Sequence, residues 1–479
     1  MIFSFTNVPY CDIISHMKAI NKTTKNVMRK VAQASPSRII PLGFMLLILI
    51  GALLLMLPIA TTSGEVPEFS TALFTSTTSV CVTGSVVVDT YSYWSLFGHI
   101  IILLLIQLGG LGIVAVISMV ITATEKRRKN FYGMMLLKDS FNLESMRGVR
   151  PFIARVFKGT LTVEAIGALG YFFAFIPQFG WVKGIWYSFF TSVSAFCNAG
   201  IDIIGPDSLT QYYDKPAVLI TTMFLIVAGG IGYVVWFDLG FTRRVFYKQR
   251  KDSPTSGEHT KLVLIITAVL IVFGTIMTLA LEWDNPKTIG NMNVGEKVMN
   301  SMFQSVTYRT AGFTTFSQAD MHQSTSFIGD ILMFIGGSPV GTAGGVKTIT
   351  MFVVVANLGT FLRGKYEITV FGRRISDDMV RKAMAIVTMH LFTLFTLTAA
   401  LIITEKVLLA DALYEVTSAL CTVGLSRGLT PDLHLAGRII LIIAMILGRI
   451  GPISMALFFK TGPGNSNSVR PAKGRFIIG

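Results

Sequence analysis

The sequence predicts an all-α integral membrane protein with four pseudo-symmetric span–pore loop–span repeats around a central ion pore. Three observations predict this fold class. Of the 479 residues, 52% are hydrophobic and only 14% are charged, well below the roughly 25% charge of an ordinary soluble domain. Eight apolar runs approach or exceed the roughly 18 residues that cross a bilayer. One short motif that ends in glycine recurs four times at a nearly constant spacing.

The apolar runs alternate with more polar segments and are expected to form multi-pass membrane-spanning helices. They lie at residues 39–59, 95–122, 159–176, 217–237, 262–281, 327–362, 383–404 and 436–459. The first 38 residues are polar and basic, with no apolar core followed by a small-residue cleavage site. We therefore expect no cleavable signal peptide, and the first span is expected to act as the insertion signal.

Lysine and arginine residues gather in every second loop, which predicts the orientation of the chain. Of the 41 basic residues, 31 lie in residues 1–38, 124–158, 243–261, 362–382 and 460–479. Both termini and these loops are therefore expected on the cytoplasmic side of a cell membrane. Because the net charge of +15 is mostly topological, we expect contact with anionic membrane lipid and no nucleic-acid partner.

The external segment within each pair of spans is too long and too apolar to be a plain loop. In the first pair it reads PEFSTALFTSTTSVCVTGSVVVDT, which is a helix-like stretch, a Thr/Ser-rich turn, a glycine and an extended return. Non-helical backbone at membrane depth is tolerated only where it is buried in protein or lines a water-filled path. Each segment is therefore expected to dip back into the membrane as a pore loop.

The motif CVTG at residues 81–84 recurs as CNAG at 197–200, RTAG at 309–312 and CTVG at 421–424. The closing glycines are 116, 112 and 112 residues apart, a distance that fits two membrane helices with a hairpin between them. It is too long for a solenoid repeat. The expected parts of the chain are a tail at 1–38, repeats at 39–123, 152–240, 259–362 (with a broken second span) and 379–459, and a tail at 460–479.

The four turns have the properties of a cation filter. Four copies around an axis could point carbonyl oxygens at a shared centre and replace the hydration shell of a monovalent cation. Glycine permits the backbone angles that this requires, and the negative end of each preceding helix favours a cation. The expected ion-binding residues are Cys81, Val82, Thr83, Gly84, Cys197, Asn198, Ala199, Gly200, Arg309, Thr310, Ala311, Gly312, Cys421, Thr422, Val423 and Gly424.

Two other interpretations of the turns stay open. Small residues with glycine are common packing notches between membrane helices, although four regularly spaced copies make that interpretation weaker. A metal–thiolate site is the second, but the third turn has neither cysteine nor histidine. The cysteines are expected to point behind the turns, without a redox role.

The sixth span is interrupted by GGSPVGTAGGVKT at residues 336–348. Five glycines and a proline in ten residues are incompatible with a continuous helix. We interpret the stretch as a flexible loop across the pore below the filter, with a simple kink as the alternative. Its candidate residues are Gly336, Gly337, Ser338, Gly341, Thr342, Ala343, Gly344, Gly345 and Lys347.

Arg449 lies in the eighth span, within LGRIGP. A charge at the bilayer centre costs roughly 2.5–3.5 kcal/mol, and such residues usually face a bundle interior or water. Arg449 is therefore expected to face the interior of the bundle or water. The alternative is a purely structural ion pair with a buried acid such as Glu164.

Several motifs carry a resemblance to a known family: LLMLPIATT, VTGSVVVDT, QLGGLGI, SAFCNAGI, YRTAGF, TAGGVKT, TVGL and LGRIGP. From about Ser37 onward the chain resembles the potassium-translocating subunits of the Trk/Ktr/HKT superfamily, most closely the bacterial KtrB type. The resemblance implies K⁺ as substrate at the filter carbonyls, no cofactor in this chain, and the loop at residues 336–348 as a gate. It places Arg449 below the filter, where its charge would repel resting cations.

The resemblance also implies a homodimer in a bacterial plasma membrane and a cytoplasmic nucleotide-binding ring of the KtrA/KtrC type as regulatory partner. Sodium dependence stays open. One departure is Cys81, where the family has threonine. The other functions considered are the potassium-binding subunit of an ATP-driven pump and an intramembrane cysteine enzyme. The enzyme lacks a histidine partner at membrane depth, so we expect a transport protein.

Overall fold

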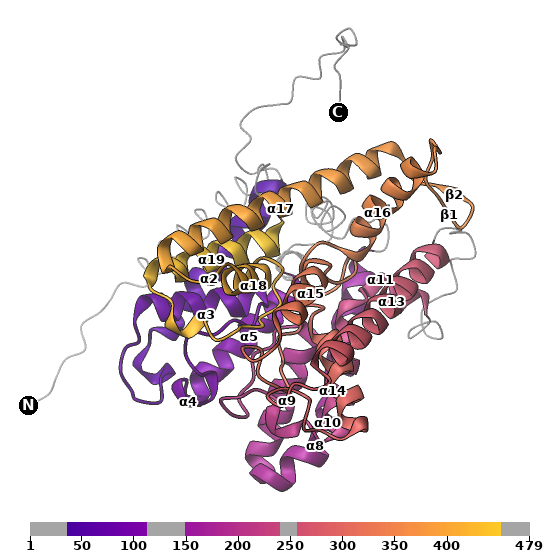
Figure 1. Cartoon of the computed structure of the whole chain (residues 1–479). Helices are drawn as coiled ribbons and strands as arrows, with labels where there is room; N and C mark the ends of the chain where they lie inside the picture. Colours follow the sequence, from indigo (N-terminus) through magenta and orange to yellow (C-terminus); the bar gives the residue numbers. More distant parts are fainter. Residues whose placement is uncertain (1–35, 113–148, 240–255, 452–479) are drawn as a thin grey trace, which may run out of the picture.

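The computed structural model describes residues 36–112, 149–239 and 256–451 (Figure 1). The tail expected at 460–479, most of the tail expected at 1–38, and the inner ends of the second spans of the first and fourth repeats lie outside the described residues. Within them the chain is mostly helical. The exception is a two-stranded antiparallel hairpin, in which β1 (Thr369–Val370) pairs with β2 (Arg373–Arg374).

The same order of elements occurs four times: a long first helix, a short pore helix and a second helix. The first repeat holds α2 (Pro36–Leu55), α3 (Phe69–Cys81), the short α4 (Thr90–Tyr93) and α5 (Leu96–Leu111). The second holds α8 (Val149–Phe179), α9 (Trp181–Cys197), α10 (Pro216–Gly230) and α11 (Tyr233–Asp238). The third holds α13 (Ser256–Glu282), α14 (Val294–Thr307), α15 (Gln323–Phe334) and α16 (Thr348–Leu362). The fourth holds α17 (Asp377–Glu405), α18 (Leu409–Leu420) and α19 (Leu435–Ile450).

All four first helices begin two or three residues before the expected repeat boundaries. The first turns of α13 and α17 carry acidic side chains, so hydropathy does not detect them. These side chains are Glu258 in α13 and Asp377 and Asp378 in α17. Acidic side chains stabilise the positive N-terminal end of a helix, so a helix can begin at such residues.

The described helices differ in whether they are long and apolar enough to cross a membrane. Ala154–Phe179, Gly257–Glu282 and Asp377–Glu405 are long and apolar enough, with mean hydropathies of 1.5, 2.8 and 2.1. Four apolar helices are shorter: Pro41–Leu55, Leu96–Leu111, Pro216–Gly230 and Thr348–Leu362. The run expected at 217–237 therefore forms two helices, α10 and α11, instead of one. In the run expected at 95–122, α5 ends at Leu111, and residues 113–122 lie outside the described part of the chain. Helices α5 and α10 end early because glycines with positive φ, Gly112 and Gly232, follow them.

Contacts between repeats close the bundle into a ring. The second helix of each repeat packs against the pore helix of the next, in the pairs α5–α9, α10–α14, α15–α18 and α19–α3. The fourth repeat thereby returns to the first, and the chain colours follow one another around the molecule in Figure 1. Large apolar side chains stay exposed on the outer helices, among them Leu53 (63%), Phe173 (83%) and Ile403 (76%). Such faces suit contact with lipid.

Small residues hold three pore helices against the first helices of their own repeats. A pore-helix serine donates a hydrogen bond to a first-helix carbonyl: Ser76 to Ile48 (2.7 Å), Ser192 to Glu164 (2.6 Å) and Ser305 to Ile271 (2.8 Å). Beside each serine the first helix has a glycine, and a Cβ there would lie within 2.3–2.5 Å of the serine oxygen: Gly51, Gly167 and Gly274. Close packing of small residues with interhelical hydrogen bonds is the usual device of membrane bundles.

Candidate functional site

Each of the four motif turns follows the C-terminus of a pore helix and has the same unusual backbone. The closing glycines have positive φ: Gly84 (99°), Gly200 (65°), Gly312 (82°) and Gly424 (92°). The residues two positions earlier also have positive φ: Val82 (56°), Asn198 (60°), Thr310 (70°) and Thr422 (52°). The residue between them does not. This alternation turns successive carbonyl groups toward one side of the chain, whereas in an ordinary strand they alternate.

The left-handed conformation at Val82, Thr310 and Thr422 is costly, since β-branched residues rarely adopt it. Strain of this kind costs on the order of 1–3 kcal/mol per residue and is characteristic of functional sites. It persists here because every one of these residues is at most 1% exposed and is fixed by its surroundings.

The glycines bring the four turns together in a closed ring. A Cβ built on each glycine would meet the carbonyl oxygen of the residue just before the next repeat's glycine. The pairs are Gly84 with Ala199 (2.4 Å), Gly200 with Ala311 (2.5 Å), Gly312 with Val423 (2.7 Å) and Gly424 with Thr83 (2.2 Å). Real Cβ atoms do not approach so closely. The glycines therefore lie between neighbouring turns and are not notches between packed helices.

The amide groups of the turns are bonded back to the pore helices. The N–H groups of Thr83, Ala199 and Val423 donate to carbonyl oxygens five residues earlier, each at 2.8 Å, and the Ala311 N–H donates to Thr307 at 3.0 Å. The Gly84 and Gly424 N–H groups donate to the hydroxyls of Thr78 and Ser418, each at 3.0 Å. Because the donors face the protein, the turn carbonyls are the groups available to the centre of the ring.

The three cysteines of the turns, Cys81, Cys197 and Cys421, are fully buried and in the thiol form. Cys197 lies 3.8 Å from the amide oxygen of Gln107 and 4.0 Å from the carboxylate of Glu164, both outside the ring. The Cys197 thiol thus lies behind its turn. The described residues contain no cluster of three His, Cys, Asp or Glu side chains that could hold a metal.

The ring opens on one side into a cavity of about 640 Å³ that all four closing glycines line. Its walls also carry three carboxylates, Asp89, Asp202 and Asp207, and no lysine or arginine is among its lining residues. A concave surface with one sign of charge raises the local concentration of counter-ions. The cavity is therefore a vestibule suited to cations.

The loop between α15 and α16 lies on the other side of the ring and contacts several repeats. Within it, Gly336 N–H donates to Val346 O (3.0 Å) and Ser338 Oγ lies 3.2 Å from Thr348 Oγ1. Toward the second repeat, Thr342 donates through its N–H to Gly229 O (3.1 Å) and through its hydroxyl to Phe196 O (3.1 Å).

Other loop residues reach the third and fourth repeats. The Gly344 N–H donates to the hydroxyl of Thr310 (3.2 Å), and a Cβ on Gly344 would meet the hydroxyl oxygen of Thr422. Lys347 donates to the carbonyl oxygen of Ala343 at 2.5 Å. The loop thus has a defined conformation across the side of the ring opposite the vestibule, and a simple kink does not describe it.

Arg449 links this loop to the first repeat. Its guanidinium donates to Thr342 O at 2.6 Å and to the carbonyl oxygen of Gly109. The alternative expectation of an ion pair with Glu164 is not met in the described residues. Glu164 instead accepts from Gln107 at 3.4 Å. Arg449 thus lies beside the loop and is held there by two backbone carbonyl groups, which no sequence pattern identifies.

One glycine set was missed from the sequence. The first glycine of QLGGLG, VAGGIG and ILGRIG contacts the last turn of its own pore helix, where a Cβ would lie within 1.8–2.1 Å of a carbonyl oxygen: Gly109 with Val80, Gly229 with Phe196 and Gly448 with Leu420. The recurrence of these segments after three of the four filter turns could have revealed them. In this pattern Arg449 occupies the position of Gly110 and Gly230.

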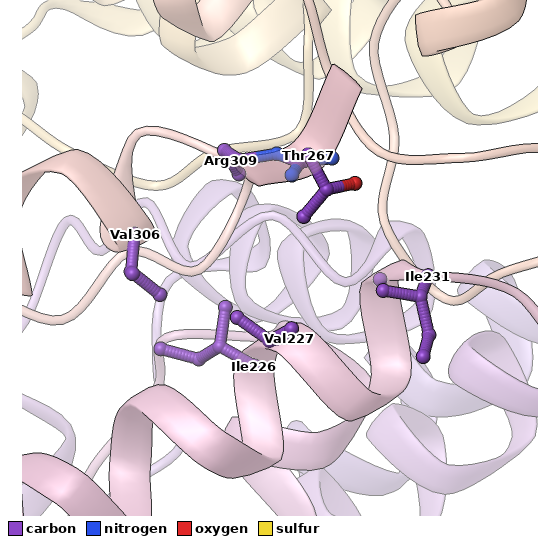
Figure 2. A pocket seen from close by; sticks show the side chains of 7 residues that line it. Ile226, Val227, Ile231, Thr267, Val306 and Arg309 are labelled. Atoms are coloured by element: carbon purple, nitrogen blue, oxygen red, sulfur yellow. The ribbon is translucent and has the colours of Figure 1, made fainter. Parts of the chain in front are cut away.

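Arg309, in the third turn, points away from the ring. Its side chain lines a small separate cavity between α10, α13 and α14, together with Thr267 and apolar residues (Figure 2). Its backbone carbonyl accepts from the Asn198 side chain at 3.4 Å, which ties the third turn to the second.

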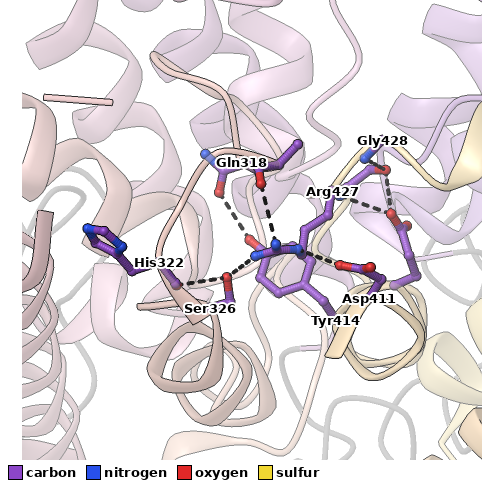
Figure 3. Close-up of polar contacts among 10 residues, drawn as sticks. Gln318, His322, Ser326, Asp411, Tyr414, Arg427 and Gly428 are labelled. Carbon is purple, nitrogen blue, oxygen red and sulfur yellow. Dashed lines mark hydrogen bonds and ion pairs between the residues drawn. The ribbon is translucent and has the colours of Figure 1, made fainter. Parts of the chain in front are cut away.

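A polar network joins the third and fourth repeats beside the vestibule (Figure 3). Gln318 accepts from Gln304 on α14 (2.6 Å) and from the Tyr414 hydroxyl on α18 (3.0 Å). Arg427, three residues after Gly424, donates to Asp411 (2.8 Å) and to Ser326. No sequence pattern signalled this network, because its members come from separate segments.

We expect Gln318→Leu to lower the free energy of unfolding of the purified protein by about 1–3 kcal/mol, because the buried Gln304 amide and Tyr414 hydroxyl lose the hydrogen bonds that they make with Gln318. Gln318, Gln304 and Tyr414 are 4%, 0% and 0% exposed. Thermal unfolding in detergent measures the effect. Gln323→Leu is the matched control, since Gln323 is exposed. Equal loss of stability in both variants would contradict a bridging role for Gln318.

Comparison with known proteins agrees with this geometry. The family described as "TrkH: Cation transport protein" matches residues 4–469. The Ktr system potassium uptake protein B of Bacillus subtilis is 37% identical over 442 residues, which cover 92% of this chain and 97% of the relative. The potassium/sodium uptake protein NtpJ of Enterococcus hirae is 36% identical and covers 91% and 96%. The crystal structure of the potassium transporter TrkH from Vibrio parahaemolyticus matches with a TM-score of 0.67 at 17% identity, covering 88% of this chain and 85% of that one.

Proposed function

Because this chain belongs to the TrkH family of cation transport proteins, we propose that it takes up potassium through the ring of four turns, down the electrochemical gradient. As a member of that family it is an ion transport protein and not an enzyme. The observation that carries the proposal is the closed ring, in which each glycine lies against a carbonyl of the next turn. Carbonyl oxygens held in this way replace the water around a dehydrated cation.

The test is rubidium uptake and growth at low potassium in bacteria that lack their own potassium uptake systems. The wild-type chain, expressed with a candidate cytoplasmic partner, is expected to restore both. Failure to restore either, with the protein present in the membrane, would contradict the proposal. Repeating the measurement with and without sodium tests coupling, which the name of the Enterococcus hirae relative suggests for that protein.

The loop of residues 336–348 is proposed as the gate. It lies across the inner side of the ring, and its hydrogen bonds to Gly229, Phe196 and Thr310 would have to break for ions to pass. Arg449 adds a bond to Thr342 and places a positive charge nearby. Both features would oppose the exit of cations from the ring to the cytoplasm.

The regulatory partner is proposed to be a cytoplasmic nucleotide-binding ring that docks on the basic loops of a homodimer in the bacterial plasma membrane, with both termini on the cytoplasmic side. The relatives named as Ktr system proteins support a transporter that works within such a system. Binding of a purified ring to vesicles that carry this chain tests the docking. Vesicles of the same lipid without the chain are the control, and equal binding to both would contradict it.

We expect the affinity for potassium to fall as the external pH falls from 8 to 6, because a vestibule carboxylate becomes protonated. Burial raises the pKa of Asp202 to about 7, although the Ser208 hydroxyl and the Ile204 N–H lower it in part. Asp202 is thus charged above that pH, where it attracts cations, and neutral below it. Loss of this charge is expected to raise the half-saturating rubidium concentration about threefold. The Asp202→Asn variant should have the higher value at every pH, and an unchanged pH dependence in that variant would contradict the assignment.

A further inference from the structure

Arg309 breaks the fourfold pattern of the turns. The residue three positions before the closing glycine is a fully buried cysteine in the other three turns, Cys81, Cys197 and Cys421. In the third turn it is an arginine that is only 7% exposed. The substitution places a guanidinium group just beyond Thr307, the last residue of α14.

This guanidinium has no counter-ion among the described residues. No ion pair there involves Arg309, and its Nε atom is buried without a hydrogen-bond partner. Other arginines near the ring differ. Arg427 pairs with Asp411, Arg438 pairs with Glu68, and Arg449 donates to two carbonyl oxygens.

The surroundings of Arg309 do not screen its charge. The cavity that it lines measures about 10 Å³, room for at most one water molecule. Most of the other walls are apolar, including Ile226, Val227 and Val306, as Figure 2 shows. The polar exception is Thr267, whose hydroxyl is buried and also without a partner. A charge in such a setting acts over a longer range than a charge in water.

The field of this charge opposes the binding of cations in the ring. The C-terminus of a helix carries about half a negative charge, which favours a cation, and all four pore helices end at the ring. At α14 the adjacent guanidinium cancels this effect, whereas α3, α9 and α18 keep it. Fast conduction requires ions to bind strongly enough to enter but weakly enough to leave. The fixed positive charge of Arg309 behind one turn lowers the affinity of the ring for cations and so favours their release.

We propose that Arg309 is an affinity-determining residue whose unpaired charge weakens cation binding by the four-turn ring, an inference that rests on the proposed potassium transport. The lack of side-chain partners makes the alternative of a purely structural anchor weaker, since substitution of Arg309 removes no side-chain hydrogen bond among the described residues.

The test uses Arg309→Cys, which gives the third turn the residue of the other three, and Arg309→Lys, which keeps the charge. Potassium binding to the purified full-length chain is measured by isothermal titration in choline chloride, and rubidium uptake is measured in cells. We expect Arg309→Cys to lower the dissociation constant about 3- to 30-fold, the range for one partly screened charge nearby. Arg309→Lys should stay within about twofold of wild type.

A second variant leaves Arg309 in place and neutralises its charge with an acidic side chain on the other side of the cavity. Thr267→Asp puts a carboxylate on the opposite wall and should lower the dissociation constant in the same direction as Arg309→Cys. If Arg309→Cys does not fold, the dissociation constant of Thr267→Asp still tests whether the charge of Arg309 weakens potassium binding. Unchanged or weaker binding in the folded variants overturns the inference, provided that wild type binds potassium. If wild type itself neither binds potassium nor takes up rubidium, the proposed function fails instead.

Discussion

Replacing Gly424 with serine is expected to lower the affinity for rubidium at least about 100-fold, equivalent to about 2.7 kcal/mol, and to abolish discrimination against sodium. A Cβ at this position would lie 2.2 Å from Thr83 O and 2.8 Å from the Cα of Gly84, both backbone atoms that cannot rotate away. The φ of 92° adds strain for any residue with a Cβ. The first and fourth turns would have to move apart, which would widen the ring.

Gly312→Ser should lower the rubidium affinity less in the same assay. A Cβ at Gly312 would lie 2.7 Å from Val423 O, whereas a Cβ at Gly424 would lie 2.2 Å from Thr83 O. Gly64→Ser is the matched control. Gly64 also has positive φ (74°), but it is exposed and has no atom within 4 Å of a Cβ. Uptake by the control should equal that of wild type. If Gly424→Ser and Gly64→Ser transport alike at equal expression, the four turns do not form the filter.

Replacing Arg449 with glutamine is expected to raise the maximal rate of rubidium uptake about 3- to 10-fold. Hydrogen bonds from a charged donor contribute about 1.5–3 kcal/mol each, and the variant loses or weakens two that hold the loop, to Thr342 O and Gly109 O. It also removes a positive charge from the inner side of the ring. Opening of the loop should then cost less free energy. Initial rates at saturating rubidium give the comparison.

Arg438→Gln provides the control, because Arg438 lies on the same helix and makes comparable contacts, to Ser70 and Glu68, away from the loop. Its maximal rate should not rise. The gate assignment predicts an increase also for Thr342→Val, which removes the hydroxyl bond to Phe196 O. A lower or unchanged rate for both loop variants would mean that the loop is not the barrier.

The sequence predicted the parts of this site with unequal success. The four glycine turns were found because their spacing repeats and because glycine marks backbone that other residues resist. The loop at 336–348 was found because its composition excludes a helix. The stop of the second helices at Gly112 and Gly232 was missed, since the apolar runs continue past them and hydropathy does not report φ.

The sequence by itself determined that the chain is a four-repeat helical membrane protein, because hydrophobicity and repeat spacing are properties of the linear order of residues. Only the tertiary structure decided which groups meet across repeats. Gly424 lies against Thr83, and Arg449 bonds to Thr342 and Gly109. Arg309 is buried with no counter-ion among the residues that the structure describes. The contacts among them join residues up to 341 positions apart in a chain of 479, and they exist only because the four repeats pack against one another around the ring.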